Sequence, residues 1–179
     1  MATPTTLPST FTAGQVLTAA QMNNLRGAFR VLQVVSATKT DTFTVTTNTF
    51  TDVTGLSVTI TPSSTSSKIL VFGSITGCHD AGVSEGGVRM VRDTTPIMVG
   101  DTAGSRTSGF QIQTASGNLI DTIAGQVLDS PASTSALTYK WQVMSAATAT
   151  FYVNRSKTDT NANYTFRAAS SITALEISA

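Results

Sequence analysis

The chain is poor in the residues that most chemistry requires. Cys78 and His79 are the single cysteine and the single histidine among 179 residues. One cysteine excludes an internal disulfide and a cysteine-rich metal site. No stretch approaches the roughly 20 consecutive apolar residues of a membrane helix, and the N-terminus lacks the apolar core of a signal peptide. We therefore expect no membrane insertion.

Charge is scarce as well. Charged residues make up 12% of the chain, and the formal net charge is +1. No basic run is present, so a surface that follows nucleic-acid phosphates is not expected. A surface with so little charge instead suggests that other copies or other proteins cover much of it.

The motifs of common enzymes are missing. A Ser/His/Asp set would have to use His79, yet the chain contains no G-x-S-x-G elbow. Cys78 does not help, because adjacent residues on an extended chain point to opposite sides. His79 and Asp80 could supply two metal ligands, whereas zinc sites use three or four, and no calcium-loop pattern is present. We expect no enzymatic activity, no catalytic residue, no metal and no cofactor.

What the chain has in abundance is Ser and Thr, which together form roughly three residues in ten and favour turns and strands. In the stretch 50–72, Leu56, Val58 and Ile60 alternate with hydroxyl residues, as in a half-buried strand. Pro62 ends this strand, and a polar turn leads to the more fully apolar strand that begins at Lys68. The pattern predicts an all-β fold.

Strand patterns recur every 10 to 15 residues from Val31 onward. Some neighbouring patterns belong to one bent strand, so we expect eight to ten strands in a jelly-roll-like β-sandwich over residues 33–179. The predicted segments are 31–38, 42–46, 49–54, 56–61, 68–76, 86–93, 96–99, 106–113, 118–128, 137–145, 148–155 and 171–177.

Residues 1–32 precede this domain and predict a short arm followed by a helix. Thr18 and Gln21 form a capping box at the start of the helix. Apolar residues at helical spacing follow, with Leu17 placed to form a hydrophobic staple. The predicted anchoring or interface residues are Leu17, Met22, Leu25, Phe29 and Leu32. Two interpretations remain open: the stripe packs on the chain's own sheet, or the segment inserts into a neighbouring protein.

Two aromatic residues, Tyr139 and Trp141, share one face of the strand ALTYKWQVM. Exposed aromatic rings often form carbohydrate platforms, so this pair is a candidate glycan site. The commoner alternative is that both rings lie in the core of the sandwich.

Several phrases of the chain occur together in a known group of proteins. They are FTAGQVLTAAQMNNL, DVTGLSVTITPSSTSSKILV, VRDTTPIMVGDTAGSR, LDSPASTSALTYKWQV and FYVNRS. The combination, which spans about residues 11–177, resembles a family of phage and prophage virion proteins of the tail-fibre type. The resemblance implies a homotrimer with a β-rich head, anchored to the virion by its N-terminal part, and it supplies no catalytic residues.

The resemblance leads to our functional hypothesis, a non-enzymatic virion protein that contacts other phage proteins of the tail, baseplate or capsid. Long shafts and large receptor-binding tips, which related fibres often carry, are missing, and this favours a capsid decoration or head-fibre protein as one alternative. A carbohydrate-binding module that recognises a host surface glycan is another. A fragment of a glycan hydrolase is the third.

Overall fold

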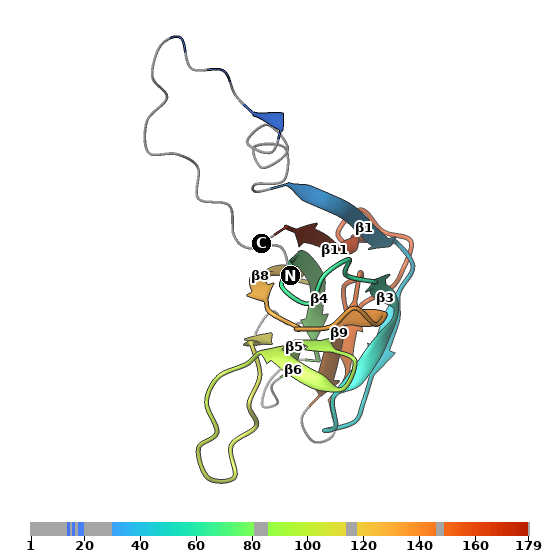
Figure 1. Ribbon diagram of the computed structural model, residues 1–179. Helices are drawn as coiled ribbons and strands as arrows, with labels where there is room; N and C mark the ends of the chain where they lie inside the picture. The colour runs from blue at the N-terminus through green and yellow to red at the C-terminus, as the bar shows by residue number, and fades with distance from the viewer. Residues whose placement is uncertain are drawn as a thin grey trace.

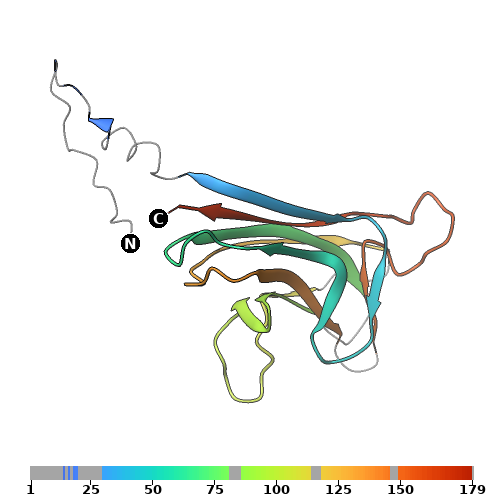
Figure 2. The same cartoon turned by 45° about the vertical axis from the view of Figure 1, so that its right-hand side comes forward.

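The chain forms a sandwich of two antiparallel sheets in a computed structural model that describes residues 14, 16, 18–19, 30–80, 86–113, 118–145 and 149–178. The strands in this part of the chain are β1 (Val31–Lys39), β2 (Phe43–Val45), β3 (Thr51–Ile60), β4 (Lys68–His79), β5 (Gly86–Arg92), β6 (Thr95–Met98), β7 (Gln111–Gln113), β8 (Asp121–Asp129), β9 (Leu137–Ser145), β10 (Phe151–Val153) and β11 (Ser170–Ile177). Figure 2 shows the two layers from the side, with β1, β11 and β4 in the upper one.

The strand pairing is that of a jelly roll. The first long strand pairs with the last (β1 with β11), and then β3 pairs with β9, β4 with β8, and β5 with β7. Successive pairs alternate between the sheets. The long strands of the first sheet have the order β1-β11-β4-β8, and the short strand β10 pairs with the end of β4 and with β2. In the second sheet the order is β3-β9-β5, and β5 also pairs with β6 and β7. This arrangement confirms the predicted all-β sandwich of jelly-roll type.

The described residues contain eleven strands, so the expected eight to ten was too low. Three of the eleven, β2, β7 and β10, are only three residues long. The predicted segments 49–54 and 56–61 form a single bent strand, β3. Its pairing with β9 shifts register between Asp52 and Ser57, where Gly55 has a φ of 82°. Glycine adopts this left-handed conformation without the steric cost that a Cβ would bring.

The core lies between the sheets and is built from alternate residues of each strand. The strand β9 shows the pattern clearly, because Leu137, Tyr139, Trp141 and Val143 are buried while the residues between them are partly exposed. In β4, Ile69, Val71 and Ile75 face the same core. The period-2 alternation in the sequence therefore identifies correctly which residues share one side of a strand.

The predicted N-terminal helix lies almost wholly outside the described residues, as do Leu17, Met22, Leu25 and Phe29. Leu32, placed by the sequence at the end of the helical stripe, lies instead in strand β1 and is 39% exposed. The reason is that β1 pairs with β11 from Val31 onward, and Ser178 donates a backbone hydrogen bond to Arg30 just before it. Within the described residues, no helix is long and apolar enough to cross a membrane.

Candidate functional site

The only histidine lies beside a serine, but the hydrogen bonding does not activate that serine. Nε2 of His79 is 3.0 Å from Oγ of Ser145, and this hydroxyl donates to the carbonyl of Ala149 at 2.7 Å. Because the Ser145 hydroxyl donates its proton to Ala149, it accepts a hydrogen bond from His79. The imidazole is therefore not positioned to remove a proton from Ser145. Both residues are buried, and burial lowers the pKa of His79, although Asp80 opposes the shift.

Neither Cys78 nor the acidic residues form a chemical centre in the described part of the chain. Cys78 is fully buried in β4, and burial raises the pKa of its thiol. A buried thiol with a raised pKa carries little thiolate and is a poor nucleophile. Among the described residues, no three His, Cys, Asp or Glu side chains gather closely enough to hold a metal ion.

The candidate glycan platform of Tyr139 and Trp141 is wrong, because both side chains are fully buried in the core. The indole of Trp141 donates to the carbonyl of Ser171 at 3.3 Å, which links the second sheet to the first. The hydroxyl of Tyr139 donates to Asp129 at 2.7 Å, and Arg92 donates to the same carboxylate oxygen at 2.5 Å. Burial and the bond to Asp129 raise the pKa of Tyr139. Both aromatic residues therefore hold the two sheets together.

A second buried polar group, Glu176 of β11, fastens the turn between β3 and β4. Its carboxylate accepts hydrogen bonds from the backbone and hydroxyl of Ser63, at 2.7 and 2.6 Å, and from the amide of Gln33 at 2.6 Å. Burial by itself raises the pKa of Glu176, but the hydrogen bonds from Ser63, Ser67 and Gln33 outweigh it and lower the pKa to about 2. The carboxylate is thus kept ionised without a cation beside it.

The outer face of the second sheet is charged. Lys140 of β9 lies 2.5 Å from Asp52 of β3, and Gln142 donates to the same carboxylate at 2.6 Å. Arg89 of β5 donates to Gln142 at 2.8 Å, and its guanidinium lies 4.0 Å from the centre of the Phe50 ring. We call this group the charged face. Its charges already have partners within the chain.

The outer face of the first sheet has the opposite character. One row of directly paired residues crosses all four long strands of this sheet and consists only of aliphatic side chains. The row is Val34 of β1, Leu175 of β11, Leu70 of β4 and Leu128 of β8. Its two ends are open to solvent, with Val34 57% and Leu128 58% exposed. Such cross-strand neighbours touch side by side on one surface.

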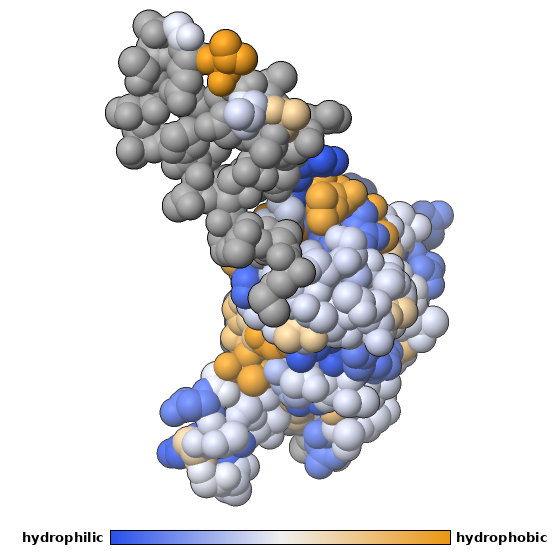
Figure 3. Space-filling view, in the orientation of Figure 1, coloured by the Kyte–Doolittle hydropathy of each residue, from blue (hydrophilic) through white to orange (hydrophobic). Residues whose placement is uncertain are grey.

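Apolar residues continue on either side of this row. Phe72, two residues beyond Leu70, is 40% exposed. Toward the other end, Val31 pairs with Ile177 and is 48% exposed. We call the row together with Phe72, Val31 and Ile177 the apolar face. Figure 3 shows apolar side chains at the surface over the start of β1, and a second group beside β6. A contiguous apolar patch of several hundred square ångströms on one molecule typically marks an interaction site.

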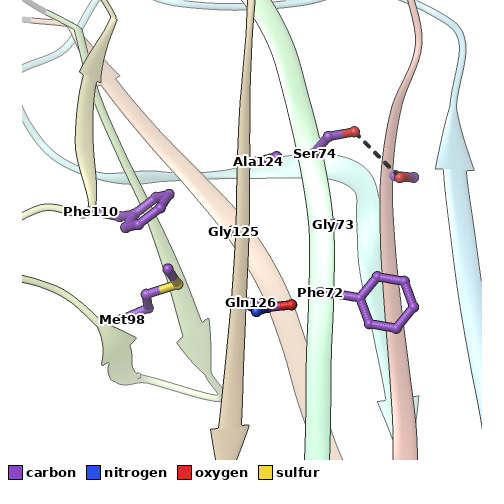
Figure 4. A pocket seen from close by; sticks show the side chains of 9 residues that line it. Phe72, Gly73, Ser74, Met98, Phe110, Ala124, Gly125 and Gln126 are labelled. Carbon is purple, nitrogen blue, oxygen red and sulfur yellow. Dashed lines mark hydrogen bonds between the residues drawn. The ribbon is translucent and has the colours of Figure 1, made fainter.

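A groove of about 590 Å³ adjoins the apolar face at Phe72. The paired residues Gly73 of β4 and Gly125 of β8 belong to its lining, and a side chain at Gly125 would point to the inner side of the sheet, against Phe110 and Met98. A Cβ at Gly73 would lie 2.3 Å from the carbonyl oxygen of Ser171, so glycine is required there. Figure 4 shows Phe72 on one side of the two glycines and Phe110 and Met98 on the other. Phe72 therefore borders the groove on the outer side of the sheet, whereas Phe110 and Met98 lie beneath Gly125 on the inner side.

The apolar face was not predicted from the sequence, although the sequence contains a signal for it. The segment Ile69-Leu-Val-Phe72 is apolar in both phases of the strand alternation. A strand that is apolar on both sides is typical of burial on both sides. Residues 172–177 of β11 repeat this feature, with Ile172 and Ala174 facing the core and Leu175 and Ile177 facing outward. Within the described residues, however, no segment covers the outward apolar side of β4 and β11.

Comparison with known proteins assigns the chain to no family. No protein-family model matches the chain, and a search of curated proteins finds no match. Among solved structures, the chain is similar to one described as "Structure of infectious bursal disease virus Gx strain", with a TM-score of 0.39 and 13% sequence identity. The alignment covers 83% of this chain and 39% of the other, so this chain spans about two fifths of its length.

Proposed function

We propose that this chain is a non-enzymatic structural protein of a bacteriophage virion, a fibre-like homotrimer attached to the particle through residues 1–32. The observation that carries the proposal is the apolar face, an aliphatic row across four strands of one sheet that the described residues leave open to solvent. The sequence phrases that resemble phage virion proteins support the same class. In this proposal the apolar face of one copy is covered by the next copy.

The size of the face supports a stable contact. Four strands at their normal spacing, and four outward residues along each, give a surface of roughly 19 by 26 Å. This flat outline of about 500 Å² is more than half of the approximately 800 Å² that each partner buries in a complex of standard size, and the relief of the side chains adds accessible area to it. The centres of such interfaces are depleted in charge. Lys68 is the one charged residue among the outward-facing residues of β1, β11, β4 and β8.

Threefold symmetry suits this arrangement. In a closed ring, each copy presents one surface to a different surface of its neighbour, and a single type of contact covers every copy. No disulfide contributes, since the only cysteine, Cys78, is buried. The contact therefore depends on apolar burial.

Light scattering on the purified full chain tests the assembly. We expect about three times the chain mass of 18.6 kDa, unchanged by a reducing agent. A monomer at micromolar concentration contradicts the proposal. A mass that falls when reducing agent is added contradicts an assembly held by apolar contacts.

Gold-labelled antibody on purified particles tests the location, and it separates tail, baseplate and capsid by where the gold is seen. Deletion of residues 1–30 tests the anchor. We expect a folded β-domain, shown by its circular dichroism, that no longer joins the particle. Loss of the β signal after the deletion would instead mean that the segment packs on its own sheet, and this would overturn the anchoring role.

A further inference from the structure

The longest connection in the C-terminal part of the chain, residues 154–169 between β10 and β11, projects from one end of the sandwich (Figure 2). It precedes β11, whose other end pairs with the start of β1. This distal loop therefore lies at the end of the sandwich away from the point where residues 1–30 join it. Two of its aromatic residues are open to solvent, Tyr164 at 57% and Phe166 at 53%.

The distal loop is held in shape by its own hydrogen bonds. At its base, the backbones of Arg155 and Arg167 pair in an isolated antiparallel β-bridge. Above the bridge, Ser156 and Phe166 are joined by two hydrogen bonds of 3.2 Å. At the tip, the hydroxyl of Thr165 donates to the carbonyls of Thr160 and Ala162 at 2.7 and 2.9 Å. A binding site on such a loop loses little entropy when a ligand binds, because the loop is already ordered.

A hollow of about 380 Å³ lies within this loop. The residues that line it include an aromatic residue, an amide residue and a carboxylate–guanidinium pair, namely Phe166, Asn161, Asp159 and Arg167. The amide of Asn161 makes no side-chain hydrogen bond to the other described residues, so its donors and its acceptor are free for a ligand. One apolar ring surface beside several planar polar groups suits a molecule with an apolar face and many hydroxyls, which is the chemistry of a sugar ring.

The charges of the hollow are largely balanced within the chain. Asp159 pairs with Arg167 at 2.7 Å and with Arg155 at 3.5 Å. Nearby, Lys157 pairs with Asp80. Cations that already have carboxylate partners attract an anionic ligand weakly, because binding it would mean breaking or sharing those pairs. The chemistry of the hollow favours an uncharged ligand.

We propose that the distal loop binds a neutral hexose unit of a polysaccharide. The ring of Phe166 packs on the C–H face of the sugar, and Asn161 and Asp159 form hydrogen bonds with its hydroxyls. This inference goes beyond the structural role proposed above. Only the outward display of the loop on a particle rests on that role; binding by the isolated protein does not. Three loops on a trimer would add their weak affinities through effective concentration.

Saturation-transfer NMR on the full-length protein tests the site. The probes are the methyl glycosides of glucose, galactose, mannose and N-acetylglucosamine, with that of sialic acid as the anionic comparison, each at about 10 mM, since single sugars in such sites bind with dissociation constants of about 1–10 mM. We expect transfer to at least one of the four neutral glycosides. Phe166→Ala should weaken its binding about tenfold, as expected for loss of an aromatic stacking partner. Asn161→Ala should weaken it less, and Leu119→Ala, which removes an exposed apolar side chain from another loop, should have no effect.

Three results would overturn the proposal: no transfer to any of the four glycosides, unchanged binding by Phe166→Ala, or a clear preference for sialic acid, which would mean that Arg167 selects an anion. Circular dichroism shows whether each variant remains folded. Light scattering of the same samples separates the two proposals. A trimer that binds none of the sugars overturns the sugar site alone, and a monomer that binds one overturns the trimer alone.

Discussion

The inner faces of the two sheets are alike in composition, whereas their outer faces differ. Inside, both contribute alternating apolar residues to one core. Outside, the second sheet has a network of charges joined to one another, from Asp52 to Arg89. The first sheet instead has the aliphatic row from Val34 to Leu128. Charges with partners in their own chain are suited to contact with water, whereas a row of aliphatic side chains is stabilised only when it is covered. In the proposed assembly, the contrast assigns the contact between copies to the outer side of the first sheet.

The largest effect that we predict comes from placing charge on the apolar face. Val34→Asp combined with Leu128→Asp puts a carboxylate at each end of the aliphatic row. Burial of a Val or Leu side chain contributes about 1.5–3 kcal/mol, so losing two should raise the dissociation constant of the assembly at least about a hundredfold. Light scattering over a range of concentrations measures the change.

The matched control is Thr59→Asp, on an exposed outward position of the second sheet. It adds a carboxylate to the charged side and should leave the mass unchanged. If the control dissociates the assembly and the double variant does not, the two faces have been assigned the wrong way round.

The sequence was informative about the inner side of the sheets and much less about the outer side. Strict alternation, as in Leu56, Val58 and Ile60, shows which residues of a strand share a side, and proline and glycine show where strands end. The aliphatic row, however, depends on the register of three strand pairs at once. Register follows from long-range packing that a single segment of sequence does not contain.

The same limit applied to the candidate site. The alternation placed Tyr139 and Trp141 on one side of a strand, but it left open whether that side was inner or outer. Both rings are buried, whereas the exposed aromatic residues, Tyr164 and Phe166, lie in a loop without periodicity. Exposure in a loop depends on what packs above it, and the local sequence carries no pattern for this.

A smaller effect concerns the pH dependence of stability. It should be clear for Glu176, the buried carboxylate of the first sheet, and weak for Asp52, the exposed carboxylate of the second. The pKa of Glu176 is lowered to about 2 from its ordinary value of 4.5. A lowered pKa in the folded state adds stability that is fully present above pH 4.5 and is lost as the pH falls through 2. The shift corresponds to about 3 kcal/mol at neutral pH. Glu176→Gln should therefore lose most of this stability at pH 7, and nothing relative to wild type near pH 2.

Urea unfolding at several pH values between 2 and 7 measures this dependence. Asp52→Asn is the control on the charged face. Burial opposes the lowering of the pKa of Asp52, the bonds from Lys140 and Gln142 produce it, and the side chain is 51% exposed. Solvent weakens such an interaction, so the curve of this variant should stay close to wild type. Parallel curves for wild type and Glu176→Gln would show that Glu176 does not stabilise the fold as an ionised group.

The smallest effect concerns the charged face itself. Lys140→Met removes the cation that lies 2.5 Å from Asp52 and keeps a similar length of apolar side chain. Exposed ion pairs contribute about 0.2–1 kcal/mol, and dissolved salt screens them. We therefore expect a loss within that range in dilute buffer, a smaller loss in about 1 M sodium chloride, and an unchanged mass by light scattering. A loss comparable to that of Glu176→Gln, or a change in mass, would mean that the charged face is covered in the assembly, since only desolvation makes such a pair costly to break. The two outer faces would then both be contact surfaces, and the contrast between them would concern the kind of partner rather than its presence.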